Sequence, residues 1–379
     1  MQILKIKKMK EKQIISQVEI YKLRIPLIEP FITSLAYETH VENIIVVLKT
    51  ENGLTGFGEC SPYMPVNGES LDTCYIVGQY FAKLLKGKNA LELESNLHVM
   101  DKLIFGNSSI KSAFDIALHD IIGQHRGVPI YKLYNGKNNK TLVTDYTVSL
   151  DEPEKMAADA IRIKEKGYPS IKVKLGDNGK KDIERIKMIR KAVGKKIPLR
   201  IDANQGWDLK EAIETLKGLA KFNVEHCEEP IPKWDYMRLR KVKKNSPITI
   251  MADESCGDPH DAEKLIQLKA CDMFNIKVGK AGGLFNAHKI AKLGEKAGME
   301  MQVGAFLESR LGMTASAHLA LCSDAIVHCD FDTPLMFSED IVTGGLTYHE
   351  NGVMKVPDSP GLGAVIEQEK LNNLEHVVI

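Results

Sequence analysis

Residues 170–176 read Ser-Ile-Lys-Val-Lys-Leu-Gly, an aliphatic run interrupted by two lysines. Side chains alternate between the two faces of a β-strand, so the three aliphatic residues share one face, while Lys172 and Lys174 share the other. An apolar face opposite a cationic face fits a barrel strand, with helices packed outside and a polar pocket inside. An exposed edge strand with two solvated lysines is the alternative, and the later chain decides between the two interpretations.

A strand followed by a helix recurs from Thr141 onward, at intervals of about 24–28 residues. The predicted strands are 142–148, 170–175, 198–202, 224–228, 248–253, 272–277, 300–304 and 326–330. Amphipathic helical patterns fill the gaps, as at 153–166 and 180–193. Repeated strand–helix units predict a parallel sheet, and eight in succession predict a closed (β/α)₈ barrel.

The residues before the barrel have a different organisation. Their patterns predict strands at 18–23 and 43–49, a turn at 51–54, helices at 70–85, 91–103 and 109–125, and loops at 30–37 and 56–65. The second loop is predicted from its glycines and prolines. This is an α+β unit of about 120 residues in front of the barrel.

The composition excludes several classes of protein. The chain has 379 residues, 44% of them apolar, which suits two domains or a barrel with an addition. A net charge of +1 gives no electrostatic reason to expect nucleic acid or an anionic membrane as a partner. The seven cysteines form no C-x-x-C pair, so we expect a reducing, cytoplasmic location. Residues 1–13 lack the apolar core of a signal peptide and are predicted to be a disordered extension.

Ionisable residues close the predicted strands, where barrel enzymes carry their catalytic groups. In chain order they are Lys174, Asp202, Glu228, Asp253 and Lys277, followed by Asp330 with Asp332 on the last strand. Each closes an otherwise apolar run. Solvated charges at strand ends are a poor explanation for five consecutive strands that each end in one.

Three of these residues predict a metal site. Carboxylates from adjacent strands repel one another unless a cation lies between them, and all-oxygen ligands with room for water and substrate favour Mg²⁺. The predicted ligands are Asp202, Glu228 and Asp253. We choose Glu228 over Glu229 because it is the terminal inward residue, and we assign Glu254 to a supporting or substrate contact.

Two lysines predict the reaction. Lys174 on the second strand and Lys277 on the sixth lie opposite each other in an eight-stranded barrel. One could remove the proton from a carbon next to a carboxylate, and the other could return a proton to the opposite face, with Mg²⁺ stabilising the enediolate. Lys172 is better placed to bind a carboxylate oxygen. The product would be an epimer.

Five motifs together resemble the enolase superfamily, and most closely its muconate-lactonizing subgroup. They are K-V-K at 172–174, R-I-D-A-N at 200–204, C-E-E-P at 227–230, M-A-D-E-S at 251–255 and N-I-K at 275–277. The resemblance implies a modified TIM barrel, (β/α)₇β, with an N-terminal α+β capping domain completed by the C-terminal segment. The implied boundaries are 14–135 for the cap, 136–340 for the barrel and 341–379 for the returning segment, with the loops 30–37 and 56–65 as a lid.

The last strand indicates a branch of that subgroup. Asp330 and Asp332 are two residues apart and share a strand face, so they could bind an ammonium group, although a helix N-cap or a surface turn would also explain them. This D-x-D resembles the signature of dipeptide epimerases, whose substrates have a free α-ammonium. The resemblance also implies that Thr147 contacts the substrate and that Glu308 hydrogen-bonds Lys277.

The substrate is less sharply indicated. The resemblance makes L-Ala-D/L-Glu the lead, but the first lid loop has no basic residue to bind an acidic side chain. Its Tyr37, together with Met64 of the second loop, could accept a less polar one. The alternatives within the same subgroup are an N-succinylamino acid racemase, an o-succinylbenzoate synthase and a cycloisomerase. A non-catalytic binding barrel is a further alternative. Assembly into homo-oligomers is common among such barrels.

Overall fold

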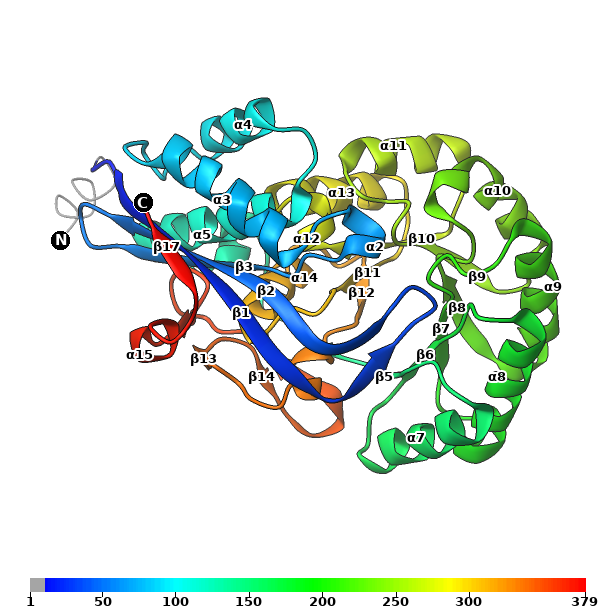
Figure 1. Ribbon diagram of the computed structural model, residues 1–379. Coiled ribbons are helices and arrows are strands. Elements are labelled where there is room, and N and C mark those ends of the chain that lie inside the picture. Colours follow the sequence, from blue (N-terminus) through cyan, green and yellow to red (C-terminus); the bar gives the residue numbers. More distant parts are fainter. Residues whose placement is uncertain (1–10) are drawn as a thin grey trace.

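The computed structural model describes residues 11–379, and an antiparallel sheet with its helices covers one end of a curled parallel sheet (Figure 1). Residues 1–10 of the predicted extension lie outside the described residues. At the end of that predicted segment, Gln13 is buried, and its backbone N–H donates to Asn89 Oδ1 at 3.0 Å. The ordered packing therefore includes Gln13.

The cap is built on a four-stranded sheet in the order β17-β1-β2-β3. Its strands are β1 (Ile15–Ile32), β2 (Tyr37–Thr50), β3 (Thr55–Cys60) and β17 (His376–Val378). Its helices are α2 (Met64–Asn67), α3 (Leu71–Leu85), α4 (Leu93–Leu103) and α5 (Ser108–Arg126), followed by the short α6 (Ile130–Leu133). Because β17 pairs antiparallel with β1 at Glu19↔Val378, the C-terminal segment completes the cap as the resemblance implied.

The predicted loop at 56–65 is wrong in its first half, which is β3. Glycines at 56 and 58 suggested a turn, but they serve close packing: a Cβ atom on Gly58 would collide with the carbonyl oxygen of Ala113 on α5, and one on Gly56 with that of Ala117. The predicted loop at 30–37 is likewise shorter, because β1 runs to Ile32 and β2 begins at Tyr37.

The second part is an eight-stranded parallel sheet whose order follows the chain from β5 to β12. Its strands are β5 (Tyr146–Val148), β6 (Ile171–Lys174), β7 (Leu199–Asp202), β8 (Val224–Glu228), β9 (Thr249–Ala252), β10 (Met273–Lys277), β11 (Met301–Gly304) and β12 (Ile326–Cys329). An isolated bridge joins Thr144, two residues before β5, to Cys329 of β12.

Seven of these strands are followed by α-helices, while the eighth is followed only by a short 3-10 helix, which confirms the (β/α)₇β architecture. The helical elements are α7 (Pro153–Glu165), α8 (Gly179–Val193), α9 (Leu209–Leu219), η1 (Ala220–Phe222), η2 (Lys233–Asp235), α10 (Tyr236–Asn245), α11 (Pro259–Leu268), α12 (Val278–Ala281), α13 (Leu284–Lys296), α14 (Arg310–Ala320) and η3 (Thr333–Met336). The remaining elements are β4 (Leu142–Val143), β13 (Val342–Gly344), β14 (Thr347–Tyr348), η4 (Glu350–Gly352), β15 (Val353–Lys355), β16 (Ala364–Ile366) and α15 (Gln368–Leu371).

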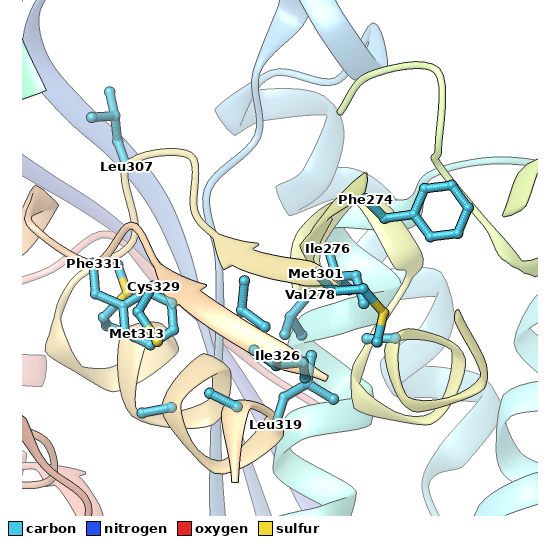
Figure 2. Packing of buried hydrophobic residues seen from close by; sticks show 14 of the residues in the cluster. Phe274, Ile276, Val278, Met301, Leu307, Met313, Leu319, Ile326, Cys329 and Phe331 are labelled. Atoms are coloured by element: carbon cyan, nitrogen blue, oxygen red, sulfur yellow. The ribbon is translucent and has the colours of Figure 1, made fainter. Parts of the chain in front are cut away.

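The hydrophobic core lies between the strands and the outer helices. On β6 the aliphatic side chains Ile171 and Val173 are fully buried on this outer side, which leaves Lys172 and Lys174 on the inner side. Figure 2 shows the same arrangement at the end of the barrel, where Cys329 and Phe331 gather with Met313 of α14. None of the helices within residues 11–379 has the length and apolar character needed to cross a bilayer.

A buried carboxylate of β3 joins the cap to the barrel. Glu59 accepts hydrogen bonds from the backbone N–H groups of Ser309 (2.9 Å) and Gly312 (2.7 Å), and from the side chain of Asn43 (2.8 Å). Ser309 is the N-cap of α14 and Gly312 lies in its first turn. Glu59 therefore holds β3 of the cap against the start of α14 in the barrel.

This packing predicts a large effect of one methyl group. Gly58→Ala should lower the free energy of unfolding by about 2–4 kcal/mol, because the clash is with backbone that cannot move aside cheaply. Urea unfolding measures the change. Gly257→Ala is the matched control: its nearest atom would be a side-chain oxygen of Asp261, at 3.2 Å, rather than backbone, and the expected change is below about 1 kcal/mol. Equal losses in the two variants would contradict the packing argument.

Candidate active site

Lys172 lies at the centre of a group of carboxylates inside the barrel. It is 2% exposed, and its Nζ lies 2.7 Å from Asp330 Oδ2, 2.9 Å from Glu228 Oε2 and 3.2 Å from Asp202 Oδ2. Burial lowers its pKa, but Asp330, Glu228 and Asp202 outweigh burial and raise the pKa well above the usual range. Lys172 is therefore a fixed positive charge.

Lys174 contacts one carboxylate of this group. Its Nζ donates to Asp202 Oδ2 at 2.7 Å. Burial raises the pKa of Asp202, yet the ammonium groups of Lys174 and Lys172 outweigh burial and bring the pKa to about 2. Asp202 is therefore ionised.

The opposite side of the site is built by β10 and the turn after it. The ammonium groups of Lys277 and Lys280 each lie 2.6 Å from a different oxygen of Asp253. Burial opposes ionisation of Lys277, but Asp253 and Glu228 dominate and raise its pKa. The same pairing with Lys277 and Lys280 lowers the pKa of Asp253. Sequence reasoning missed Lys280, because its approach to Asp253 depends on the turn of α12 after the strand.

The two adjacent glutamates at the end of β8 have different surroundings. Glu228 lies inward, beside Lys172 and Asn275, and burial together with Asp202 raises its pKa to about 8. Glu229 instead accepts hydrogen bonds from the backbone N–H groups of Asp253 (2.7 Å) and Ser255 (3.2 Å). Glu229 thus ties together the ends of β8 and β9, a bracing role that the sequence did not indicate.

Further acceptors surround the carboxylate group. Burial, and then Asp253, raise the pKa of Glu254 well above its usual range. Glu254 Oε2 and Asn204 Oδ1 are buried without a hydrogen-bond partner among the described residues. The side-chain amide of Asn204 approaches Glu254 Oε1 at 3.4 Å. Two unpaired acceptors therefore lie next to the predicted metal ligands.

Asp330 and Asp332 lie where the two edge strands meet. Asp330 binds Lys172, whereas Asp332 Oδ2 accepts the backbone N–H of Thr147 at 2.6 Å. Burial, followed by the charge of Asp330, raises the pKa of Asp332 to about 8. Asp332 therefore joins β5 to the end of β12 and places Thr147 beside the D-x-D pair.

Aromatic rings from the cap and the barrel loops cover the lysines. Phe31 lies with its ring centre 5.6 Å from Lys174 Nζ, and Phe306 lies 4.9 Å from Lys277 Nζ. Tyr63 in turn packs on Phe306, with ring centres 5.7 Å apart. The residues predicted to cover the site, Tyr37 and Met64, are 63% and 67% exposed.

Glu308 differs from the implied arrangement. Its Oε2 accepts the backbone N–H of Phe306 at 2.7 Å, while Lys277 is paired with Asp253. Burial, and next the nearby Glu59, raise the pKa of Glu308 to about 7, although Lys277 lowers it. Glu308 thus shapes the loop that carries Phe306 over Lys277.

This arrangement is suited to proton transfer between the two faces of one molecule. Lys174 and Lys277 belong to strands that are four places apart in an eight-strand order, and both are nearly inaccessible to solvent. Between them lies a group of carboxylates that a cation could neutralise. Low exposure strengthens every charge interaction in such a site.

Comparisons with known proteins agree with this geometry. Residues 15–134 match the mandelate racemase / muconate lactonizing enzyme N-terminal domain, and residues 155–370 match the enolase C-terminal domain-like family. The D-Ala-D/L-Ala epimerase of Cytophaga hutchinsonii is 53% identical over 97% of this chain and 100% of its own length. The L-Ala-D/L-Glu epimerase of Clostridium acetobutylicum is 39% identical, over 95% and 100%.

A solved structure extends the comparison to three dimensions. The crystal structure of the dipeptide epimerase from Cytophaga hutchinsonii, complexed with Mg and the dipeptide D-Ala-L-Val, matches with a TM-score of 0.96 and 53% identity, covering 97% of this chain and 100% of that chain. The family predicted from the five motifs is thereby confirmed: the chain belongs to the mandelate racemase and muconate lactonizing enzymes of the enolase superfamily.

Proposed function

We propose that the protein is an isomerase, a Mg²⁺-dependent dipeptide epimerase that inverts the α-carbon of the C-terminal residue by a two-base mechanism. The observation that carries the proposal is the pair of buried lysines, Lys174 and Lys277, on opposite strands around one carboxylate group. The names of the relatives at 53% and 39% identity support the dipeptide as substrate class.

The donor set fits Mg²⁺. Asp202, Glu228 and Asp253 would hold the ion, because all three are buried oxygen ligands at the ends of adjacent strands. The unpaired oxygens of Asn204 and Glu254 are further acceptors for bound water. When bound, Mg²⁺ supplies positive charge to the substrate carboxylate and so acidifies the neighbouring carbon. The lysines that now neutralise the ligands would become available to the substrate.

The lysines move the proton. One lysine, in its neutral form, takes the α-proton from one face of the substrate carbon, and the other, in its protonated form, donates to the opposite face. For the reverse reaction the two roles exchange. Lys172 would bind a substrate carboxylate oxygen, because its charge is fixed by its acidic neighbours.

The dipeptide's α-ammonium is assigned to the D-x-D pair. Both carboxylates are buried, but Lys172 pairs with Asp330 alone, so a second cation beside Asp332 improves the charge balance of the pair. Thr147, which Asp332 holds, would contact the peptide group. We assign Tyr37, Met64 and Glu308 to the cover of the site. The cap, residues 14–135 with 341–379, would close over the barrel of residues 136–340.

Two substrates compete within this class. L-Ala-L-Glu is the lead from the family resemblance. Ala-Ala dipeptides are the second candidate, because the relative at 53% identity is a D-Ala-D/L-Ala epimerase and the residues between β1 and β2 (Thr-Ser-Leu-Ala) offer no cation to a glutamate side chain.

Deuterium exchange tests the proposal. We expect the α-proton of the C-terminal residue to exchange in D₂O with Mg²⁺ present, with formation of the epimer, for L-Ala-L-Glu or for Ala-Ala dipeptides. Chelation of Mg²⁺ should abolish exchange, and N-succinyl amino acids should not react. Exchange confined to the succinylated compounds would assign the protein to the racemase alternative and refute the role of the D-x-D pair.

The two-base scheme predicts separable defects. Lys174→Ala and Lys277→Ala should each lower the epimerisation rate at least about 100-fold, and each variant should retain α-proton exchange for at most one epimer of the substrate. Proton NMR of both epimers measures this. Lys244→Ala, at an exposed lysine of α10, is the control and should be fully active. Normal epimerisation by either barrel-lysine variant would exclude the scheme.

The D-x-D pair predicts a selective binding defect. Asp332→Asn keeps an oxygen for the N–H of Thr147 but removes the charge, so KM for the dipeptide should rise about 10–100-fold, the value of a charge-assisted hydrogen bond. Mg²⁺ affinity, measured by calorimetry, should change less than about threefold. Asp324→Asn, at an exposed aspartate before β12, is the control. A parallel loss of Mg²⁺ affinity would show that Asp332 serves the metal site instead.

A further inference from the structure

A second cluster of ionisable side chains lies at the opposite end of the barrel from the active site. Among residues 11–379, Glu225, His226 and His328 bring three potential metal-ligating atoms within 4.8 Å of one another. The imidazole rings lie 5.4 Å apart between centres. The histidines come from β8 and β12, so the cluster spans the interior of the barrel.

Two β-bulges bring these residues together. In β8, Leu199 pairs with Val224 and Ile201 with Cys227, so Glu225 and His226 both oppose the single residue between Leu199 and Ile201. In β12, Met301 pairs with Ile326 and the next residue of β11 with His328, which leaves one residue extra. Bulges redirect side chains and are often found next to functional sites. The bulge in β8 brings Glu225 and His226 together, and the bulge in β12 brings His328 close to them.

The cluster has buried acceptors without a donor. His226 is 1% exposed, and its Nδ1 has no partner among the described residues; the same is true of Asp145 Oδ1, although Asp145 Oδ2 binds Arg200. Unpaired buried acceptors are costly, and a bound cation or an ordered water satisfies them.

Arg200 is the cation that the cluster already contains. Its guanidinium donates to Glu225 Oε2 (2.7 Å), Asp145 Oδ2 (2.9 Å) and His328 Nδ1 (2.8 Å). A divalent ion can bind Glu225 and His328 if Arg200 keeps its bond to Asp145 and releases these two side chains.

The cluster is accessible to an ion from solvent. A cavity of about 430 Å³ at this end of the barrel is lined by Arg200, His328 and Cys329. Glu225 is itself exposed to solvent. His226 and Glu228 are two residues apart on β8, about 7 Å along a strand, so ions at the two ends would be separate.

We propose that Glu225, His226 and His328 form a second metal site, which binds one transition-metal ion of the Zn²⁺ class. Two imidazoles and one carboxylate, with a position left for water, are ligands that Zn²⁺ prefers and Mg²⁺ does not. Such an ion would join β8 to β12 across the barrel, on the side away from the proposed chemistry.

Zn²⁺ titration in excess Mg²⁺ tests the proposal, with a chromophoric chelator as competitor. The full-length protein should retain one equivalent of Zn²⁺. His328→Gln and Glu225→Gln should each weaken binding at least about tenfold, as loss of a metal-site residue does, while His349→Gln, at an exposed histidine, should leave it unchanged. Glu225 tolerates replacement because it is exposed, so a folding defect in the histidine variant does not prevent the test.

Other outcomes would overturn the site. Release of all the Zn²⁺ by Mg²⁺ would place the ion on the carboxylates at the other end of the barrel. Equal affinity in all four proteins would mean that the unpaired acceptors are satisfied by water alone. Co²⁺ gives an independent reading: a four-coordinate imidazole site colours the protein strongly in the visible range, and the colour should disappear in His328→Gln.

Discussion

The structure depends on balancing buried charge at the carboxyl end of the barrel. The charged groups there are Lys172, Lys174, Lys277 and Lys280, opposite Asp202, Glu228, Asp253 and Asp330. Removing a charge from water costs several kcal/mol per ion, and only close partners offset that cost. Each lysine therefore lies within 3 Å of a carboxylate oxygen. A cation that enters this group would have to replace a lysine as the partner of its ligand, so in the proposed mechanism metal binding and release of the lysines would be the same event.

Such a balance requires that water stays out, and the cap meets this requirement. Phe31 comes from the end of β1, and Tyr63 comes from the segment after β3. Two separate parts of the cap therefore contribute a ring to the cover of the site. Glu59 fixes their position by binding the start of α14. The cap can come this close because glycines of β3 allow α5 to lie directly on the sheet. The chemistry proposed for the barrel thus depends on Gly56 and Gly58, which have no Cβ atom to keep α5 away from the sheet.

The grouping of charged residues at the mouth of the barrel could be predicted from the sequence, because it follows from two regularities. Alternation along each strand separates apolar from ionisable residues, and the barrel places all strand ends at one mouth, so Lys174, Asp202 and Lys277 could be grouped before the structure was known. The missed features depend on geometry that alternation does not encode. Lys280 reaches Asp253 through a helical turn, Glu229 adopts a positive φ of 32°, and Gly58 serves packing in a strand, although it resembles a turn residue.

Alternation also fails to predict the cluster of Glu225, His226 and His328 at the other end of the barrel. Strict alternation would place one residue of β8 opposite Arg200, but the bulge places Glu225 and His226 there together, and no local sequence signal marks a bulge of this kind. Barrel interiors are usually filled by branched apolar side chains. Here the layer beneath the reaction site is polar, and Asn275 and Gln302 each keep a buried oxygen without a partner in it among the described residues. A polar layer is retained against its desolvation cost only if something satisfies it. The bulges concentrate the strongest ligands of that layer at one point, which favours a single bound ion over scattered waters.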